Sequence, residues 1–169
     1  MAPGDQARVS VGVAVPPGDA FRVFTEEIDL WWRRGRKYRV ARGTDGVYHL
    51  EPRLGGRLFE SYATPGGTRV VETGRVTAWE PPVRLVLEWR GANFAPDERT
   101  EVEVRFEPSP GGTLVSLTHR GWSRIRDDHP ARHGQPVAAF VRMLGLWWGE
   151  LMTSLREHAA RSAAGSSQG

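Results

Sequence analysis

The sequence predicts an α+β protein in which a curved antiparallel sheet wraps around one long helix, in the order β-α-α-β6-α. Three features predict it: a long apolar stripe near the C-terminus, two short amphipathic segments near the N-terminus, and short alternating runs between them. A chain of 169 residues with 39% hydrophobic and 25% charged residues has the composition of one soluble globular domain. We expect this domain to span residues 8–158, with flexible termini at 1–7 and 159–169.

The long helix is predicted over residues 136–158. Its large apolar residues recur at steps of three and four, which places them on one face of a helix. Pro136 suits the first helical turn, where a missing N–H costs nothing. We expect a sheet to cover the apolar stripe, which comprises Val137, Phe140, Val141, Leu144, Trp147, Trp148, Leu151 and Leu155.

The N-terminal part predicts one strand and two short helices. Valines alternate with smaller or polar residues over 8–15, which is typical of a half-buried strand. Asp19 can cap a helix over 20–25, and two glutamates begin a second helix over 26–32.

Six further strands are predicted between these helices and the long one. Short Gly- and Pro-rich breaks separate the runs, and connections this short allow only antiparallel neighbours. The six runs are 47–51, 57–63, 68–79, 84–90, 100–107 and 113–118.

Three stretches in this order resemble a known superfamily. They are LEPRLGG at 50–56, WEPPVRLVLEW at 79–89 and GGTLVSLTHRGW at 111–122. Together with the element order they resemble the helix-grip fold of the START-like (SRPBCC) superfamily, in the branch related to the C-terminal domain of the 90-kDa heat-shock protein ATPase activator. The resemblance implies a hydrophobic cavity between sheet and helix; some members resemble cyclases and others act as co-chaperones. This sequence has no counterpart of the co-chaperone's additional N-terminal domain, which argues against the same role.

Alternation along the predicted strands indicates which side chains face the helix and would line a cavity. Small residues at Gly74, Ala78, Gly145 and Gly149 favour a real cavity, whereas the alternative is a core filled by aromatic rings. A small apolar or aromatic ligand is the expected occupant. Its predicted contacts are Trp31, Leu58, Tyr62, Leu87, Trp89, Val104, Phe106, Leu117, His119, Trp122, Leu144, Trp147 and Trp148.

His119 is the candidate catalytic residue. An inward imidazole beside a carboxylate such as Glu60 or Glu72 can act as general acid or base. The alternative is a structural histidine that bonds a backbone carbonyl. Glu51, before Pro52 in a turn, is expected to bond turn amides rather than to catalyse.

Each of two polar segments has both a structural and a functional interpretation. The segment 33–42 is rich in arginine and follows two tryptophans, so it is either a solvated loop or a site for an anionic group; nucleic acid is not the expected partner. His129 and His133 are spaced as metal ligands on a helix would be, but Pro130 between them argues against a helix and hence against a metal site.

The sequence lacks the residues and motifs that several common kinds of catalysis and cofactor binding require. There is no cysteine and no dinucleotide, P-loop, hydrolase-elbow or zincin motif, so we expect no cofactor and no metal. No run is apolar enough to span a membrane and no leader is recognisable, so the cytoplasm is expected. Three functions remain: a carrier or sensor of an apolar ligand, a cofactor-independent cyclase or dehydratase using His119, and a co-chaperone-like protein-interaction module. The oligomeric state is left open.

Overall fold

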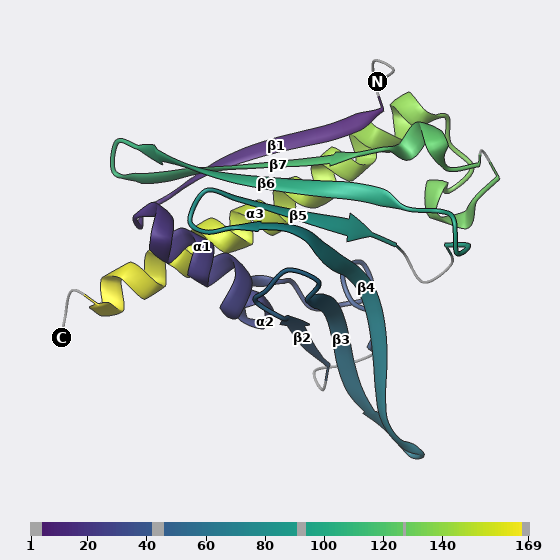
Figure 1. The fold of residues 1–169 in the computed structure, drawn as a ribbon, viewed down its shortest axis with the longest axis horizontal. Coiled ribbons are helices and arrows are strands. Elements are labelled where there is room, and N and C mark those ends of the chain that lie inside the picture. Colours follow the sequence, from purple (N-terminus) through teal and green to yellow (C-terminus); the bar gives the residue numbers. More distant parts are fainter. Residues whose placement is uncertain (1–4, 42–45, 91–93, 127, 167–169) are drawn as a thin grey trace.

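The computed structural model describes residues 5–41, 46–90, 94–126 and 128–166. Seven strands form one antiparallel sheet in the order β1-β7-β6-β5-β4-β3-β2, curled around a long helix (Figure 1). This confirms the predicted fold class and element order. The strands are β1 (Gln6–Val13), β2 (Val47–Leu50), β3 (Arg57–Thr64), β4 (Gly67–Glu80), β5 (Arg84–Trp89), β6 (Thr100–Ser109) and β7 (Gly112–Arg120).

Helices α1 (Pro17–Glu26) and α2 (Ile28–Trp31) follow β1, and α3 (Val137–Ser166) ends the chain. Two single-turn 3-10 helices, η1 (Trp122–Arg124) and η2 (Pro130–Arg132), connect β7 to α3. Helix α1 begins without a side-chain cap, so the predicted capping role of Asp19 is wrong; Asp19 lies in the first turn instead.

Both ends of the ordered structure extend beyond the boundaries predicted from sequence. Helix α3 continues past His158, and Ala159 is buried, because an Ala-rich segment keeps a high helix propensity. At the other end, Asp5 is buried and its carboxylate accepts hydrogen bonds from the backbone N–H and the hydroxyl of Ser123. The predicted flexible termini are therefore too long.

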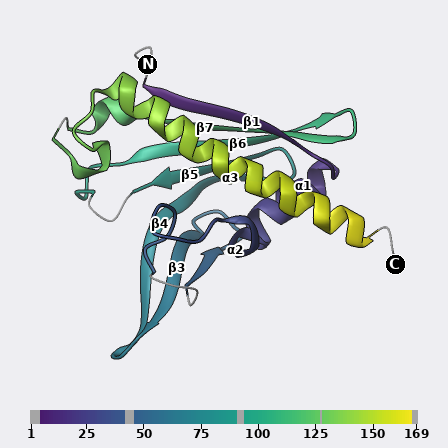
Figure 2. The same cartoon turned by 180° about the vertical axis from the view of Figure 1, so that it is seen from behind.

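Helix α3 lies across the concave side of the sheet, with its outer side uncovered (Figure 2). Its predicted stripe faces inward: Trp148, Leu151 and Leu155 are at most 1% exposed, whereas Leu144 and Trp147 are half-buried. Large apolar residues recur every three or four positions, which places them on one side of the helix, and this apolar side covers the sheet.

The predicted alternation holds across the central strands. Inward residues Leu85, Val104 and Leu117 are buried and lie directly opposite one another across β5, β6 and β7, and Leu87, also buried, lies opposite Val102. Val86 alternates with the inward-facing Leu85 and Leu87, which places it on the outer face of the sheet, yet it is only 2% exposed. We attribute this burial to the ion-pair network on that side, because its register partner Glu103 bonds both Arg84 and Arg120.

The small residues expected to border a cavity have other surroundings. A Cβ on Gly74 would lie 2.5 Å from the carbonyl oxygen of Glu88, so glycine permits close approach of β4 to β5. A Cβ on Gly145 or Gly149 would meet nothing within 4 Å. Gly74 therefore reflects strand packing rather than a cavity.

Candidate functional site

The space between sheet and α3 is occupied by a cluster of aromatic rings. Trp148 is central: its ring centroid lies 5.7 Å from Trp32, 5.6 Å from Trp89 and 6.0 Å from His119. The His119 ring in turn lies 5.1 Å from that of Trp122. Trp32 was missed by sequence reasoning, although its position one residue after Trp31 was the available signal. Trp31, which was predicted as a contact residue, packs on Phe24 and donates a hydrogen bond to the carbonyl oxygen of Phe24.

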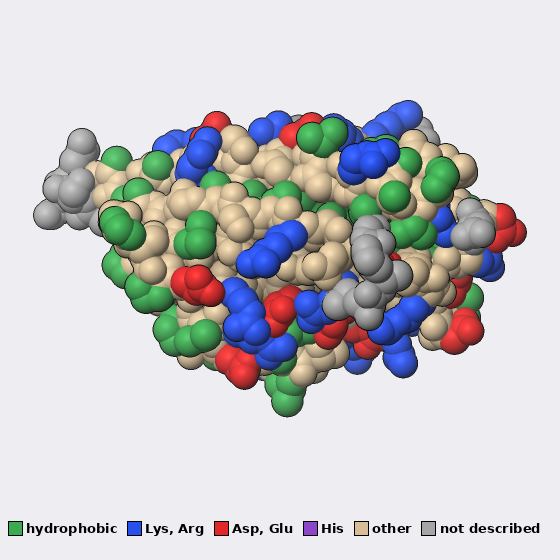
Figure 3. All heavy atoms as spheres, turned by 90° about the horizontal axis from the view of Figure 1, so that it is seen from above, with side chains coloured by type: hydrophobic (Ala, Val, Ile, Leu, Met, Phe, Trp, Pro, Cys, Tyr) green, Lys and Arg blue, Asp and Glu red, His purple; other side chains and the backbone are tan. Residues whose placement is uncertain are grey.

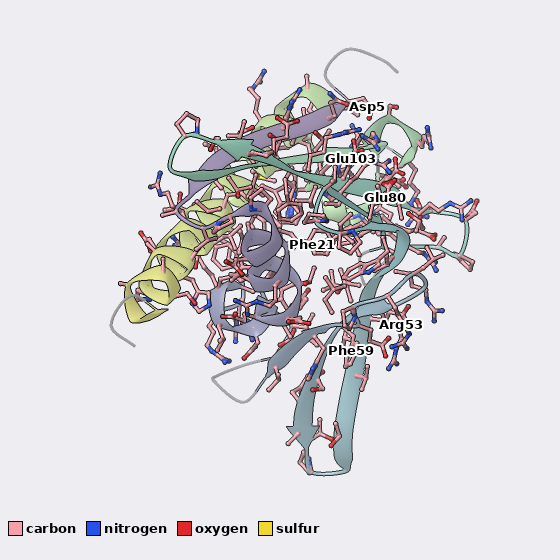
Figure 4. The ribbon with its side chains drawn as sticks, turned by 60° about the vertical axis from the view of Figure 1, so that its left-hand side comes forward. Asp5, Phe21, Arg53, Phe59, Glu80 and Glu103 are labelled. Carbon is pink, nitrogen blue, oxygen red and sulfur yellow. The ribbon has the colours of Figure 1, made fainter. Side chains whose placement is uncertain are left out.

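Most of the predicted contact residues do lie inside, in the packed core. Tyr62, Trp89, Leu144 and Trp147 are only half-buried, and Tyr62 lies toward the tip of the β3–β4 hairpin, opposite Arg69. The buried members are Trp31, Leu58, Leu87, Val104, Phe106, Leu117, His119, Trp122 and Trp148. Figure 4 shows Phe21 of α1 among the same enclosed side chains.

His119 has both ring nitrogens hydrogen-bonded inside this cluster. The indole N–H of Trp148 donates to Nδ1 over 3.1 Å, so Nδ1 carries no proton in the neutral ring. Nε2–H then donates to the hydroxyl of Thr100 over 2.7 Å, and that hydroxyl donates to the carbonyl oxygen of Trp89. The imidazole is a neutral structural link between α3 and three strands. Its partners are side chains, so the expected bond to a backbone carbonyl is wrong.

Burial lowers the pKa of His119 to about 3, because the protonated ring would lose its hydration. In the unfolded chain the pKa returns to about 6.5. As pH falls below about 6.5, His119 takes up a proton in the unfolded chain but not in the folded one. This favours the unfolded state, so the free energy of unfolding decreases progressively down to about pH 3.

We expect the free energy of unfolding to decrease by up to ~1.4 kcal/mol per pH unit from this residue. Urea denaturation between pH 6.5 and 5 measures it, in a window above the range where ordinary carboxylates titrate. In the variant His119→Gln, the slope of the free energy of unfolding against pH should be smaller by the share that His119 contributes. Equal slopes for both proteins would contradict a neutral buried imidazole.

The carboxylates suggested as partners of His119 lie elsewhere. Glu60 is buried on β3 and accepts from the backbone N–H groups of Val40 and Ala41. Three strands separate β3 from β7 in the sheet, so Glu60 and His119 belong to different parts of the interior. Glu72 pairs with Arg75 at 2.5 Å on the surface. The structure therefore does not bring together the acid–base pair that a cyclase would need.

Glu51 behaves as predicted for a turn residue. Its Oε1 accepts from the backbone N–H of Arg57 at 2.8 Å and from the guanidinium of the same residue. These bonds from Arg57, side chain first, lower the pKa of Glu51 to about 2. The carboxylate stays charged and fixes the turn before β3.

Trp122 carries an unused polar group. The residue is 3% exposed, packed against Phe140 and His119, and its indole nitrogen has no acceptor among the described residues. A buried donor without a partner costs free energy. Trp122 is thus the one predicted contact residue with a free hydrogen-bonding group in this interior among the described residues.

Five hollows over the described residues lie on the outside. None of the five is lined by His119 or by a tryptophan. Three of them follow one another over the outer face of the sheet, with volumes of about 450, 270 and 200 Å³; the first two share Glu88 and the last two share Arg120. We call this the outer groove.

The outer groove is rich in arginine. Its lining contains seven arginines, at 8, 75, 90, 99, 105, 120 and 124, and four glutamates, at 72, 88, 101 and 103. This excess of three positive charges equals the formal charge of the whole chain. In Figure 3, basic and acidic side chains mix along one edge of the molecule while hydrophobic groups are scattered.

Strand register explains how these charges coexist. Glu88 and Glu101 are directly opposite, which is unfavourable for like charges. Arg99 pairs with Glu88 at 3.3 Å and Arg120 with Glu101 at 2.7 Å, which offsets the repulsion. Among the described residues, neither Arg8 nor Arg124 has a carboxylate within ion-pair distance. These two guanidinium groups remain available to an external anion.

The basic segment after α2 is not simply a solvated loop. Arg39 has a side chain only 1% exposed and pairs with Asp29 at 2.6 Å. It also donates to the backbone carbonyls of Arg33, Trp32 and Gly46. Burial acts to raise the pKa of Asp29, but hydrogen bonds from the backbone N–H of Tyr48 and from Arg39 outweigh burial and hold this pKa below its ordinary value. Arg39 is structural, and its neighbour Arg42 lies outside the described residues.

The two histidines near η2 have different surroundings. His129 is buried, 3.5 Å from Glu98, whereas His133 is exposed with a φ of 52°. No group of three potential ligands occurs over the described part of the chain. Asp127, part of the original pattern, lies outside it.

Seven antiparallel strands curled around a C-terminal helix, with an aromatic cluster between them, define a helix-grip protein. The chain belongs to the family described as activator of Hsp90 ATPase homolog 1-like protein, whose pattern matches residues 14–157. No curated protein sequence matches it. Within the described residues, no helix has the length and apolar character needed to cross a membrane.

Solved bacterial structures share the fold at low sequence identity. A protein of Mesorhizobium loti aligns with a TM-score of 0.61 and 20% identity, covering 92% of this chain and 97% of that one. A Nitrosomonas europaea protein gives 0.63 and 15%, covering 96% and 98%. An AHSA1-like protein of Aeromonas hydrophila gives 0.58 and 18%, covering 94% of each.

Proposed function

We propose that this chain is a non-catalytic protein-interaction module that binds an acidic surface of an HSP90-type chaperone through its outer groove. One observation carries the proposal: the interior is packed with aromatic rings, while the hollows lie outside and are lined by excess arginine. Arginine presents a planar fork of donors that suits carboxylates. The family description supplies the class of partner, and the cytoplasm expected from the sequence is consistent with it.

Charge reversal in the groove tests this proposal. In the double variant Arg8→Glu, Arg124→Glu we expect affinity for a purified HSP90-type chaperone to fall about tenfold or more, and stimulation of its ATPase to be lost. Binding of the unaltered chain should also weaken between 50 and 300 mM salt, because exposed charges are screened.

Arg156→Glu, at an exposed position on α3, is the control for charge reversal outside the groove, with half the change in net charge of the double variant; it should bind as the unaltered chain does. The proposal fails if the unaltered chain neither binds the chaperone at low salt nor changes its ATPase rate. It also fails if the groove variant binds equally well.

A second function, carriage of a small apolar ligand, is favoured by the free indole N–H of Trp122. A ligand acceptor such as a carbonyl would satisfy that donor, and entry would displace Phe94, whose half-buried ring lies 5.9 Å from that of Trp122. A panel of apolar ketones and matched hydrocarbons distinguishes the two functions. Ketone-selective quenching of tryptophan fluorescence, with a raised melting temperature, would favour the carrier.

A further inference from the structure

The outer side of α3 carries an apolar stripe that no part of the described structure covers. Leu146 is 73% exposed, the highest value among the large hydrophobic residues described, and Met143 one turn earlier is 37% exposed. Elsewhere such residues are scattered singly, which is ordinary for a protein surface. Here they lie on one straight helix whose outer side faces the viewer in Figure 2.

Helical spacing places four further residues beside this stripe. Relative to Leu146, positions 142, 149, 150 and 153 fall within about a third of the helix circumference. Gly149 lacks a side chain, and a Cβ built there would meet nothing within 4 Å, so another backbone can approach closely. Arg142 is exposed and has no ion pair among the described residues. Glu150 is 37% exposed at its side chain and pairs with Lys37 at 2.9 Å.

The order of these charges is self-complementary. Arg142 and Glu150 lie four residues before and four residues after Leu146. If two α3 helices pair antiparallel about a two-fold axis at Leu146, Arg142 of each copy comes level with Glu150 of the other. The two leucines then meet at the axis. A two-fold contact must repeat each pairing in this reciprocal way.

We propose that two copies of this chain associate through this face, with α3 helices antiparallel and centred on Leu146. The reciprocal charges select a second copy over an arbitrary apolar partner, and they set the antiparallel direction, because parallel helices in register would place like charges level. A contact made mainly by one helix from each copy is smaller than a standard interface of about 1,600 Å². The dimer is therefore weak and forms at high protein concentration.

Sedimentation velocity over a protein concentration series at low salt tests the proposal. The unaltered chain should shift from monomer to dimer as concentration rises from about 1 to 500 μM, an order expected for a small interface. Leu146→Glu should abolish the shift. Arg142→Glu and Glu150→Arg should each weaken association about tenfold or more, because each creates reciprocal like-charge contacts.

The double charge swap Arg142→Glu, Glu150→Arg should recover association, since the exchanged charges again complement each other across the axis. Arg161→Glu, on the same helix but about four turns away, controls for net charge and should associate normally. Circular dichroism checks that each surface variant keeps its fold. A chain that stays monomeric throughout, or a dimer indifferent to Leu146→Glu or not recovered by the charge swap, would overturn the proposal. The outer groove does not enter this test.

Discussion

Replacing Trp148 with Ala should lower the free energy of unfolding by ~3–5 kcal/mol, the range for removing a large aromatic side chain from a core. Trp148 is 1% exposed, contacts the rings of Trp32, Trp89 and Trp147, and donates to His119. The substitution removes the ring that joins α3 to the sheet and also leaves the imidazole without its donor. Urea denaturation at pH 7 measures the loss.

Two further variants separate packing from hydrogen bonding. Trp148→Phe keeps an aromatic ring but no N–H, and should cost less, about 1–3 kcal/mol, for the unsatisfied Nδ1 of His119. Leu146→Ala, on the outside of the same helix, should stay within about 0.5 kcal/mol at low micromolar concentration. A nearly neutral Trp148→Ala would mean that the aromatic cluster does not hold α3 against the sheet.

Replacing Arg39 with Ala should cost ~3–5 kcal/mol, as expected when one partner of a buried ion pair is removed. The guanidinium supplies hydrogen bonds to the carboxylate of Asp29 and to four backbone carbonyls, and the side chain is 1% exposed. Without it, Asp29 and these carbonyls lose their donor in a site that water reaches poorly. Thermal and urea unfolding should both report the loss.

Arg36→Ser is the matched control, because Arg36 belongs to the same basic segment but is exposed; it should change stability by no more than about 0.5 kcal/mol. Arg39→Lys should rescue little, since an ammonium cannot reproduce the guanidinium fork. If Arg39→Ala matched Arg36→Ser, the hydrogen bonds of Arg39 would contribute nothing to folding. Arg34 lies between these cases, with a bond to the carbonyl of Gly46 and a contact with Asp29.

Local patterns in the sequence determined the architecture. The spacing of Phe140, Trp148 and Leu155 fixed a helix with one apolar face, and alternation such as Val102, Val104 and Phe106 fixed which strand face is buried. Both patterns follow from backbone periodicity, which acts over a few residues and can be read without knowing any distant contact. Element order then left few topologies for the strands, because short connections force antiparallel neighbours.

Only the tertiary structure decided what the buried polar residues do. His119 bonds Thr100 and Trp148, which lie on different elements, and Glu60 bonds amides some twenty positions away; no local pattern specifies such partners. The same holds for Arg39. The composition of the segment around it suggested a solvated loop, whereas in the folded chain its side chain bonds Asp29 and backbone carbonyl groups. Whether aromatic side chains enclose a void or fill it depends on how their volumes interlock across the whole core, and that is a property of the packed structure alone.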